Sequence, residues 1–148
     1  MSAANLAGKK ARFWPVFIRV TLNDAARRLL DGKNFATVAT IRPDGGPQSS
    51  VVWIAREQNI PVFSITSRRQ KARNLGRDPR VSVTVFDANN PYESVEIRGT
   101  AELIEDPHKR LPKLLSHKYL GIDPPDESPR ETRLIERVIP ERVVNFSV

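Results

Sequence analysis

The stretch Phe35-Ala-Thr-Val-Ala-Thr-Ile-Arg-Pro-Asp-Gly-Gly-Pro-Gln-Ser-Ser-Val-Val-Trp-Ile-Ala55 decides the fold class of this chain. Its first seven residues are apolar or β-branched, which predicts a strand over 35–41. Residues 42–46 contain two glycines that can adopt a positive φ, and this composition is typical of a turn. The strand pattern returns over 48–55, so the stretch predicts a β-hairpin.

Further short strands follow the hairpin along the chain. The pattern predicts them over residues 60–66, 81–86, 94–104, 134–139 and 143–148, with a bulge or close approach at Gly99. Two or three helices are expected between them. One starts in a capping box at Thr21 and stops at Gly32. A basic helical turn covers 67–76, and a helix after Asp106-Pro107 has Leu111, Leu114, Leu115 and Tyr119 on its apolar face. Short strands with turns between them predict an antiparallel barrel or sandwich, not a parallel sheet.

Composition limits the function classes. The 148 residues suffice for one domain, which we expect over 21–148, preceded by a basic extension over 1–20. The chain has no cysteine, which excludes disulfides, thiolate catalysis and cysteine-ligated metals. His108 and His117 lack the carboxylate pattern of a metal site, so we expect no metal. No apolar run reaches the ~20 residues of a membrane span, and the start of the chain lacks a signal-peptide core. We therefore expect a cytoplasmic protein.

The charge points to anionic partners. The net charge is +7, and 17 of the 24 basic residues are arginine. Six of the fourteen residues from Ser67 to Arg80 are basic, and they follow a strand that ends Ser64-Ile-Thr66. Hydroxyls at a strand end, free backbone N–H groups and cations together make a phosphate cradle. A solvated basic turn is the alternative interpretation of the same residues.

The chain also resembles a known family. The stretches that carry the resemblance are Ala36-Thr-Val-Ala-Thr-Ile-Arg-Pro-Asp-Gly-Gly-Pro-Gln48, Ser50-Val-Val-Trp53, Lys71-Ala-Arg-Asn-Leu-Gly-Arg-Asp-Pro-Arg-Val-Ser82 and Glu96-Ile-Arg-Gly-Thr-Ala-Glu-Leu103. In order and spacing they are similar to the flavin and deazaflavin split β-barrel oxidoreductases of the pyridoxamine 5'-phosphate oxidase type, from about Leu22 to Val144. The resemblance implies a mainly β fold, a six-stranded antiparallel split barrel with two or three short helices. It also implies a homodimer with two cofactors in clefts at the subunit interface.

The resemblance implies a set of cofactor-binding residues as well. Family members hold the cofactor phosphate with the basic turn after the third strand, and line the ring with the second strand. An aromatic residue of the other subunit often lies near the ring. Carried over to this sequence, the phosphate role falls on Arg69 and Lys71, with the hydroxyls of Ser64 and Thr66 and with Gln70 closing the site. The ring role falls on Gln48 and Ser50, and the role of the aromatic residue falls on Tyr92. Trp53 is expected in core or dimer packing, or as a wall beside the cofactor.

The chain is most similar to the short actinobacterial members of this family that use the deazaflavin coenzyme F420. This similarity implies hydride transfer from the reduced deazaflavin to a small electrophile such as an enone or a quinone. F420 carries a phosphate and several glutamates, so a basic protein suits it better than the less anionic FMN. FMN remains the alternative cofactor, and a carrier of the same fold without turnover is a further one. The C-terminal pyridoxal-phosphate motif of the oxidase has no counterpart, so we do not expect pyridoxamine phosphate oxidation. A nucleic-acid-binding module is disfavoured, because no aromatic residue interleaves with the basic residues 68–80 to stack on bases.

Overall fold

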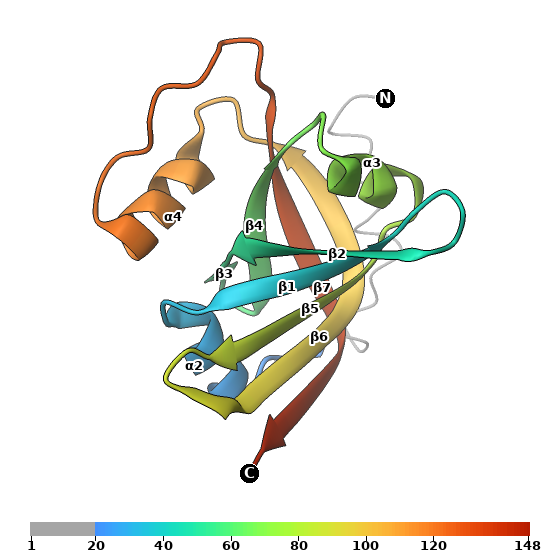
Figure 1. Cartoon of the computed structure of the whole chain (residues 1–148), viewed down its shortest axis with the longest axis vertical. Coiled ribbons are helices and arrows are strands. Elements are labelled where there is room, and N and C mark those ends of the chain that lie inside the picture. The colour runs from blue at the N-terminus through green and yellow to red at the C-terminus, as the bar shows by residue number, and fades with distance from the viewer. Residues whose placement is uncertain (1–19) are drawn as a thin grey trace.

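A computed structural model describes residues 20–148 of the chain as one curled sheet with three helices (Figure 1). The expected extension over 1–20, apart from its last residue, lies outside the described residues. The helices are α2 (Asp24–Asp31), α3 (Gln70–Arg77) and α4 (Arg110–Leu120). The strands are β1 (Phe35–Ile41), β2 (Pro47–Trp53), β3 (Ala55–Glu57), β4 (Ile60–Thr66), β5 (Arg80–Asp87), β6 (Asn90–Glu105) and β7 (Arg133–Ser147).

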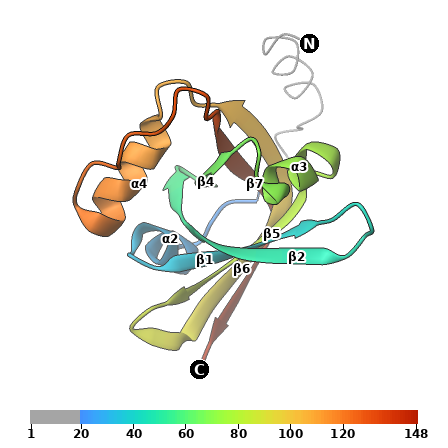
Figure 2. The same cartoon turned by 45° about the horizontal axis from the view of Figure 1, so that its top comes forward.

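All neighbouring strands pair antiparallel, in the order β2-β1-β5-β6-β7-β4-β3. The predicted class, a mainly β antiparallel split barrel with a few helices, is confirmed. The sheet has seven strands where six were expected. Strands β2 and β4 approach each other without pairing, and this opening is the split in the barrel (Figures 1 and 2).

Two predicted strand boundaries were wrong. The strand expected over 48–55 ends at Trp53, and a separate β3 starts at Ala55. The break falls at Ile54 because its backbone binds side chains of α4: its N–H donates to the Tyr119 hydroxyl, and its carbonyl accepts from the Lys118 Nζ. The strands expected over 134–139 and 143–148 are one continuous strand, β7.

The predicted bulge at Gly99 is confirmed and explains why β7 stays continuous. The register of β6 and β7 shifts between Arg98, opposite Arg142, and Gly99, opposite Pro140. A Cβ on Gly99 would lie 2.0 Å from the Ile139 carbonyl oxygen, so glycine alone permits this approach.

The helix ends show which side chains cap them. In α2 the cap is Asn23, whose side chain accepts from the Ala26 N–H at 2.8 Å; the expected cap, Thr21, lies outside the helix. In α4 the Asp106 carboxylate accepts from the N–H groups of residues 110 and 111, both at 2.9 Å. Pro112 stands in the first turn of α4, where a missing N–H costs nothing. Leu114 is 45% exposed, so its placement on the apolar face of this helix was wrong.

The main core fills the concave side of the sheet, with α2 and α3 at opposite ends (Figures 1 and 2). A second, smaller cluster joins α4 to strands β3, β4 and β7 through Ala55, Val62, Leu111, Leu115 and Ile135. Tyr119 stabilises the packing of α4 on the sheet, because its hydroxyl donates to the Asn34 carbonyl at 2.6 Å and accepts from the Ile54 N–H at 3.1 Å. Within residues 20–148, every helix is too short or too polar to cross a membrane.

Candidate functional site

The split between β2 and β4 contains a cavity of about 340 Å³, here called the anion cavity. Three hydroxyl-bearing residues reach it from facing strands: Ser50 from β2, and Ser64 and Thr66 from β4. The cationic residues that line it are Arg69, Lys71 and Arg133. Five of the eight predicted site residues, Ser50, Ser64, Thr66, Arg69 and Lys71, therefore line one cavity.

Lys71 is the central cation of the anion cavity. It lies in the first turn of α3, and its Nζ donates to the Ser50 Oγ at 2.9 Å. Its Nζ also lies 5.9 Å from the centroid of the Phe63 ring. Burial lowers the pKa of Lys71, and the nearby positive charge of Arg69 lowers it further. Two cations this close together, in a partly desolvated site, favour a bound anion that offsets both charges.

Gln48 and Gln70 do not line the anion cavity. Both bind the fully buried Asn74 of α3: its Nδ2 donates to the Gln48 Oε1 at 3.0 Å, and its Oδ1 accepts from the Gln70 Nε2 at 2.8 Å. Asn74 also donates to the Thr40 Oγ1 at 3.0 Å. Asn74, which sequence reasoning missed, thus ties α3 to strands β1 and β2 and holds Lys71 in position.

Tyr92 lies apart from the cavity. It is 63% exposed near the start of β6, in the hairpin that β6 forms with β5. It does not line the anion cavity of its own chain. The predicted role of Tyr92 beside a cofactor ring therefore requires a second copy of the chain.

Arg133, the first residue of β7, is a second site residue that the sequence analysis missed. It pairs with Thr66 across the β4–β7 register, and its Nη1 lies 3.5 Å from the Ser64 Oγ. Its guanidinium binds the Glu127 carboxylate through Nε, at 3.0 and 3.1 Å, and through Nη2. This guanidinium holds the pKa of Glu127 below its usual range. No local motif marks Arg133, because the β4–β7 pairing alone brings it to the site.

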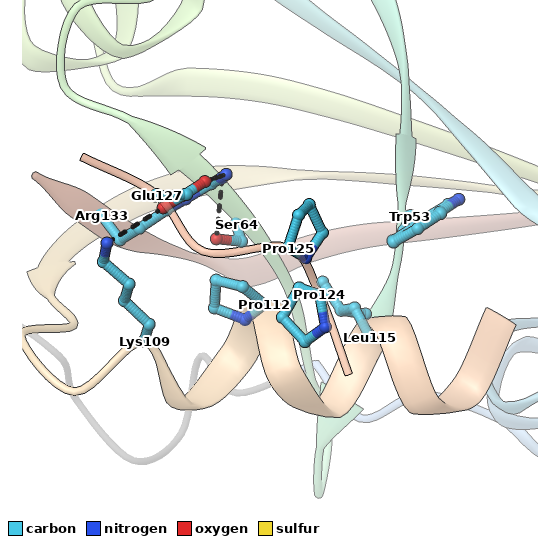
Figure 3. A pocket seen from close by; sticks show the side chains of 9 residues that line it. All are labelled: Trp53, Ser64, Lys109, Pro112, Leu115, Pro124, Pro125, Glu127 and Arg133. Carbon is cyan, nitrogen blue, oxygen red and sulfur yellow. Dashed lines mark hydrogen bonds and ion pairs between the residues drawn. The ribbon is translucent and has the colours of Figure 1, made fainter. Parts of the chain in front are cut away.

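Two further cavities adjoin the anion cavity and share Arg133 with it. The first, the arginine cavity, has a volume of about 510 Å³ and also shares Thr66 and Arg69 with the anion cavity. Its lining residues are Thr66, Arg68, Arg69, Glu127, Ser128, Glu131 and Arg133. The second, the proline cavity, has a volume of about 290 Å³ and shares Ser64 with the anion cavity (Figure 3). Its lining residues are Trp53, Ser64, Lys109, Pro112, Leu115, Pro124, Pro125, Glu127 and Arg133.

Glu136 of β7 lies inside the barrel and is fully buried. It sits opposite Phe63 in the β4–β7 register, and neither carboxylate oxygen has a hydrogen-bond partner among the described residues. Burial raises the pKa of Glu136 to about 8, and the positive charge of Lys71 partly offsets the increase. A carboxyl group with such a pKa is mostly neutral at pH 7, so it leaves most of the positive charge of Lys71 available to a ligand.

The arrangement in the split fits a phosphate group. Three cations and three hydroxyls face a single cavity, and charge-assisted donors of this kind are the strong partners of phosphate oxygens. Arg73 and Arg77, in contrast, bind the Gln70 side chain and the Ile41 carbonyl and do not line the cavity. The basic segment after β4 is therefore divided between residues that line the cavity and residues that brace the helix.

The chain is similar to proteins of known sequence family and structure. The family model described as pyridoxamine 5'-phosphate oxidase matches residues 22–146. A solved structure named F420 reductase is 32% identical over 83% of this chain and 98% of that one, with a TM-score of 0.74. A conserved hypothetical protein from Mycobacterium tuberculosis is 26% identical over 87% of this chain and 86% of that one, with a TM-score of 0.70. General Stress Protein 26 from Bacillus anthracis shares the fold, with 16% identity, coverages of 83% and 92% and a TM-score of 0.64.

Proposed function

We propose a function that starts from one premise: this chain belongs to the pyridoxamine 5'-phosphate oxidase family, the split-barrel flavin and deazaflavin proteins. Within that family, we propose that it is an F420-dependent oxidoreductase. It transfers a hydride from the reduced deazaflavin to a small electrophile such as an enone or a quinone. The similarity to a protein named F420 reductase, over most of both chains, supports this choice.

The anion cavity is where the cofactor phosphate binds in this proposal. Lys71 and Arg69 supply the positive charges, and Ser64 and Thr66 supply hydroxyl donors. Ser50, held by the Lys71 Nζ at 2.9 Å, marks the side from which the ring approaches along β2. When bound, the cofactor supplies the hydride chemistry. The chain itself binds the phosphate, orients the ring and excludes water from the split.

Within the structure, the arginine cavity is the observation that favours F420 over FMN. FMN ends at its phosphate, whereas F420 continues beyond it into a tail of carboxylates. The arginine cavity continues from the anion cavity through Thr66 and Arg69, and it adds Arg68. Three guanidinium groups line this cavity against the carboxylates of Glu127 and Glu131, so its lining keeps a net positive charge. A carboxylate tail that leaves the phosphate in this direction therefore meets guanidinium groups, which bind carboxylates well.

Titration of the protein with F420 and with FMN, followed by the fluorescence anisotropy of each ligand, tests the assignment. We expect F420 to bind at least tenfold more tightly than FMN at low salt. Added salt should reduce this difference in affinity, because it screens exposed charges. Arg68→Ala should weaken F420 binding several-fold and leave FMN binding unchanged, since Arg68 lines the arginine cavity and not the anion cavity. Equal affinities for the two cofactors would favour FMN. Tight F420 binding without reduction of any quinone or enone would favour a carrier.

We also propose that the protein is a homodimer joined through the convex face of the sheet. Strand register places Val51 and Val144 in one cross-strand row, and Phe86 and Phe146 in the next. All four side chains are at least 39% exposed, and Tyr92 lies on the same face by strand alternation. A second copy would bury this apolar surface and bring Tyr92 toward a neighbouring site.

Sedimentation velocity at micromolar concentration tests the dimer. We expect a dimer for the wild type and a monomer for Phe146→Asp, because the substitution puts a charge into the apolar face. Leu114→Asp is the matched control, since Leu114 is an exposed apolar residue on α4, away from that face. A wild-type monomer that still binds F420 would refute the interface.

A further inference from the structure

The proline cavity is distinct in character from the two cavities beside it. Its floor and walls are apolar: Pro112 and Leu115 come from α4, Pro124 and Pro125 from the loop after it, and Trp53 from the end of β2. Figure 3 shows Trp53 at one end of the cavity, the prolines between, and the charged side chains at the other end. Its volume of about 290 Å³ lies at the small end of the range for ligand sites, so it suits a molecule of one or two rings.

Trp53 provides a rigid flat wall for such a molecule. Its ring stacks on Tyr119, with centroids 5.2 Å apart and planes at 8°. Tyr119 in turn stacks on Phe35, with centroids 5.7 Å apart. A wall fixed by two stacked rings loses little conformational freedom when a planar ligand packs on it, and prolines on the opposite side have no side-chain freedom to lose.

The polar end of the cavity carries one more positive charge than negative. Arg133 and Lys109 both bind Glu127, with the Lys109 Nζ 3.3 Å from the Glu127 carboxylate. Two cations against one carboxylate leave a net charge of about +1 at this end. The same ion pairs hold the loop residue Glu127 in place at this end of the cavity. The Ser64 hydroxyl, shared with the anion cavity, adds a hydrogen-bonding group at this end.

From this geometry we infer that the proline cavity is the site of the electron acceptor, and that it selects a planar, one- or two-ring molecule with a single anionic oxygen. The rings lie between Trp53 and the prolines, and the anionic oxygen binds Arg133 and Lys109 beside Ser64. The position of the cavity supports this, because it adjoins the anion cavity through Ser64 and Arg133 and is lined by Trp53, the last residue of β2, the strand along which the ring lies in the proposed function. The role of the bound molecule as electron acceptor rests on the proposed function, whereas the binding site itself does not depend on it.

A pair of quinones tests the inference without turnover. The probes are 2-hydroxy-1,4-naphthoquinone, which is an anion at pH 7, and 1,4-naphthoquinone, which has the same rings without the charge. Binding is followed by the quenching of tryptophan fluorescence, and the absence of cysteine removes the usual covalent side reaction. We expect the anionic quinone to bind at least tenfold more tightly than the neutral one. The quenching should be largely lost in Trp53→Phe, which separates Trp53 from the other tryptophan, Trp14.

Two variants locate the site. Pro112→Phe fills the cavity from the first turn of α4 and should weaken binding of the anionic quinone at least tenfold. Lys113→Phe, at the exposed neighbouring position outside the cavity, is the matched control and should have little effect. Glu127→Gln removes the negative charge at the polar end of the cavity. It should tighten binding of the anionic quinone several-fold and leave binding of the neutral quinone unchanged. Equal effects of the substitutions at 112 and 113, or equal binding of the two quinones, would overturn the inference.

F420 binding measured on the same variants separates this inference from the proposed function. Pro112→Phe should leave F420 affinity within about twofold of wild type, whereas Lys71→Ala should weaken F420 and spare the quinone. If the protein binds the quinone but not F420, the proposed function is refuted and the ligand site in the proline cavity still stands. F420 binding in a protein that fails to bind either quinone would refute the site alone.

Discussion

Replacing the buried Glu136 by methionine should make the protein more stable at pH 8 and have little effect at pH 5. Glu136 is fully buried in the barrel, and its carboxylate oxygens have no hydrogen-bond partner among residues 20–148. An ionised carboxylate in such a place is costly, so the group stays protonated well above the pH at which it ionises in the unfolded chain. Methionine has a similar length, carries no charge and adapts to irregular space.

The size and sign of the effect follow from the pKa of Glu136, which burial raises from 4.5 to about 8. Between these pH values the folded protein keeps a proton that the unfolded chain has lost, so stability falls as pH rises through this window. Each pKa unit corresponds to about 1.36 kcal/mol, which makes the loss on the order of 3 kcal/mol at pH 7 and about 4 kcal/mol at pH 8. The methionine variant does not suffer this loss.

Urea denaturation of both proteins from pH 5 to pH 8.5, under two-state analysis, measures the difference. We expect the two free energies of unfolding to agree within about 1 kcal/mol at pH 5, the usual cost of a volume-conserving exchange, and to diverge as pH rises. Glu105→Gln, which removes a carboxylate from an exposed position on β6, separates burial from the change in net charge. Parallel pH profiles for wild type and Glu136→Met would refute the reasoning, because they would show that Glu136 ionises in the folded state at no cost.

Three more outcomes are expected. Lys71→Ala should weaken F420 binding ten- to a hundredfold in an anisotropy titration, since a hydrogen bond to a charged group contributes roughly 1.5–3 kcal/mol; Arg73→Ala, which removes a cation outside the cavity, should change it a few-fold at most. Burial lowers the pKa of Lys118 to about 8 from 10.5, so the folded state loses its proton first and wild-type stability should rise with pH between these values. Lys118→Met should remove that rise in thermal melts, and a rise of equal size in the variant would contradict the assignment. Gly99→Ala should lower the free energy of unfolding by roughly 1–3 kcal/mol or more in urea titrations, because its Cβ meets backbone 2.0 Å away; Gly76→Ala, whose Cβ has ordinary contacts, should not destabilise.

Part of the site could be predicted because its residues are close in sequence. Ser64 and Thr66 end β4, and Lys71 follows in the first turn of α3, so one strand-to-helix connection brings hydroxyls and a cation together. The sequence also held a signal for Glu136 that went unused. In β7 it lies two residues from Leu134 and two from Val138, both of which pack in the main core. Since residues two apart in a strand share a face, this spacing places the Glu136 side chain inside the barrel.

The sequence by itself determined most of the elements: the hairpin of β1 and β2, the period-two strands, the glycine at the bulge and the basic turn after β4. These depend on local backbone preferences and on alternation, which a linear pattern carries. Tertiary structure alone decided which distant residues meet. The pairing of Thr66 with Arg133 brings a guanidinium to the split, and the approach of β2 brings Ser50 to Lys71. Strand register and loop closure are set by the packing of the whole barrel, and no short stretch of sequence specifies them.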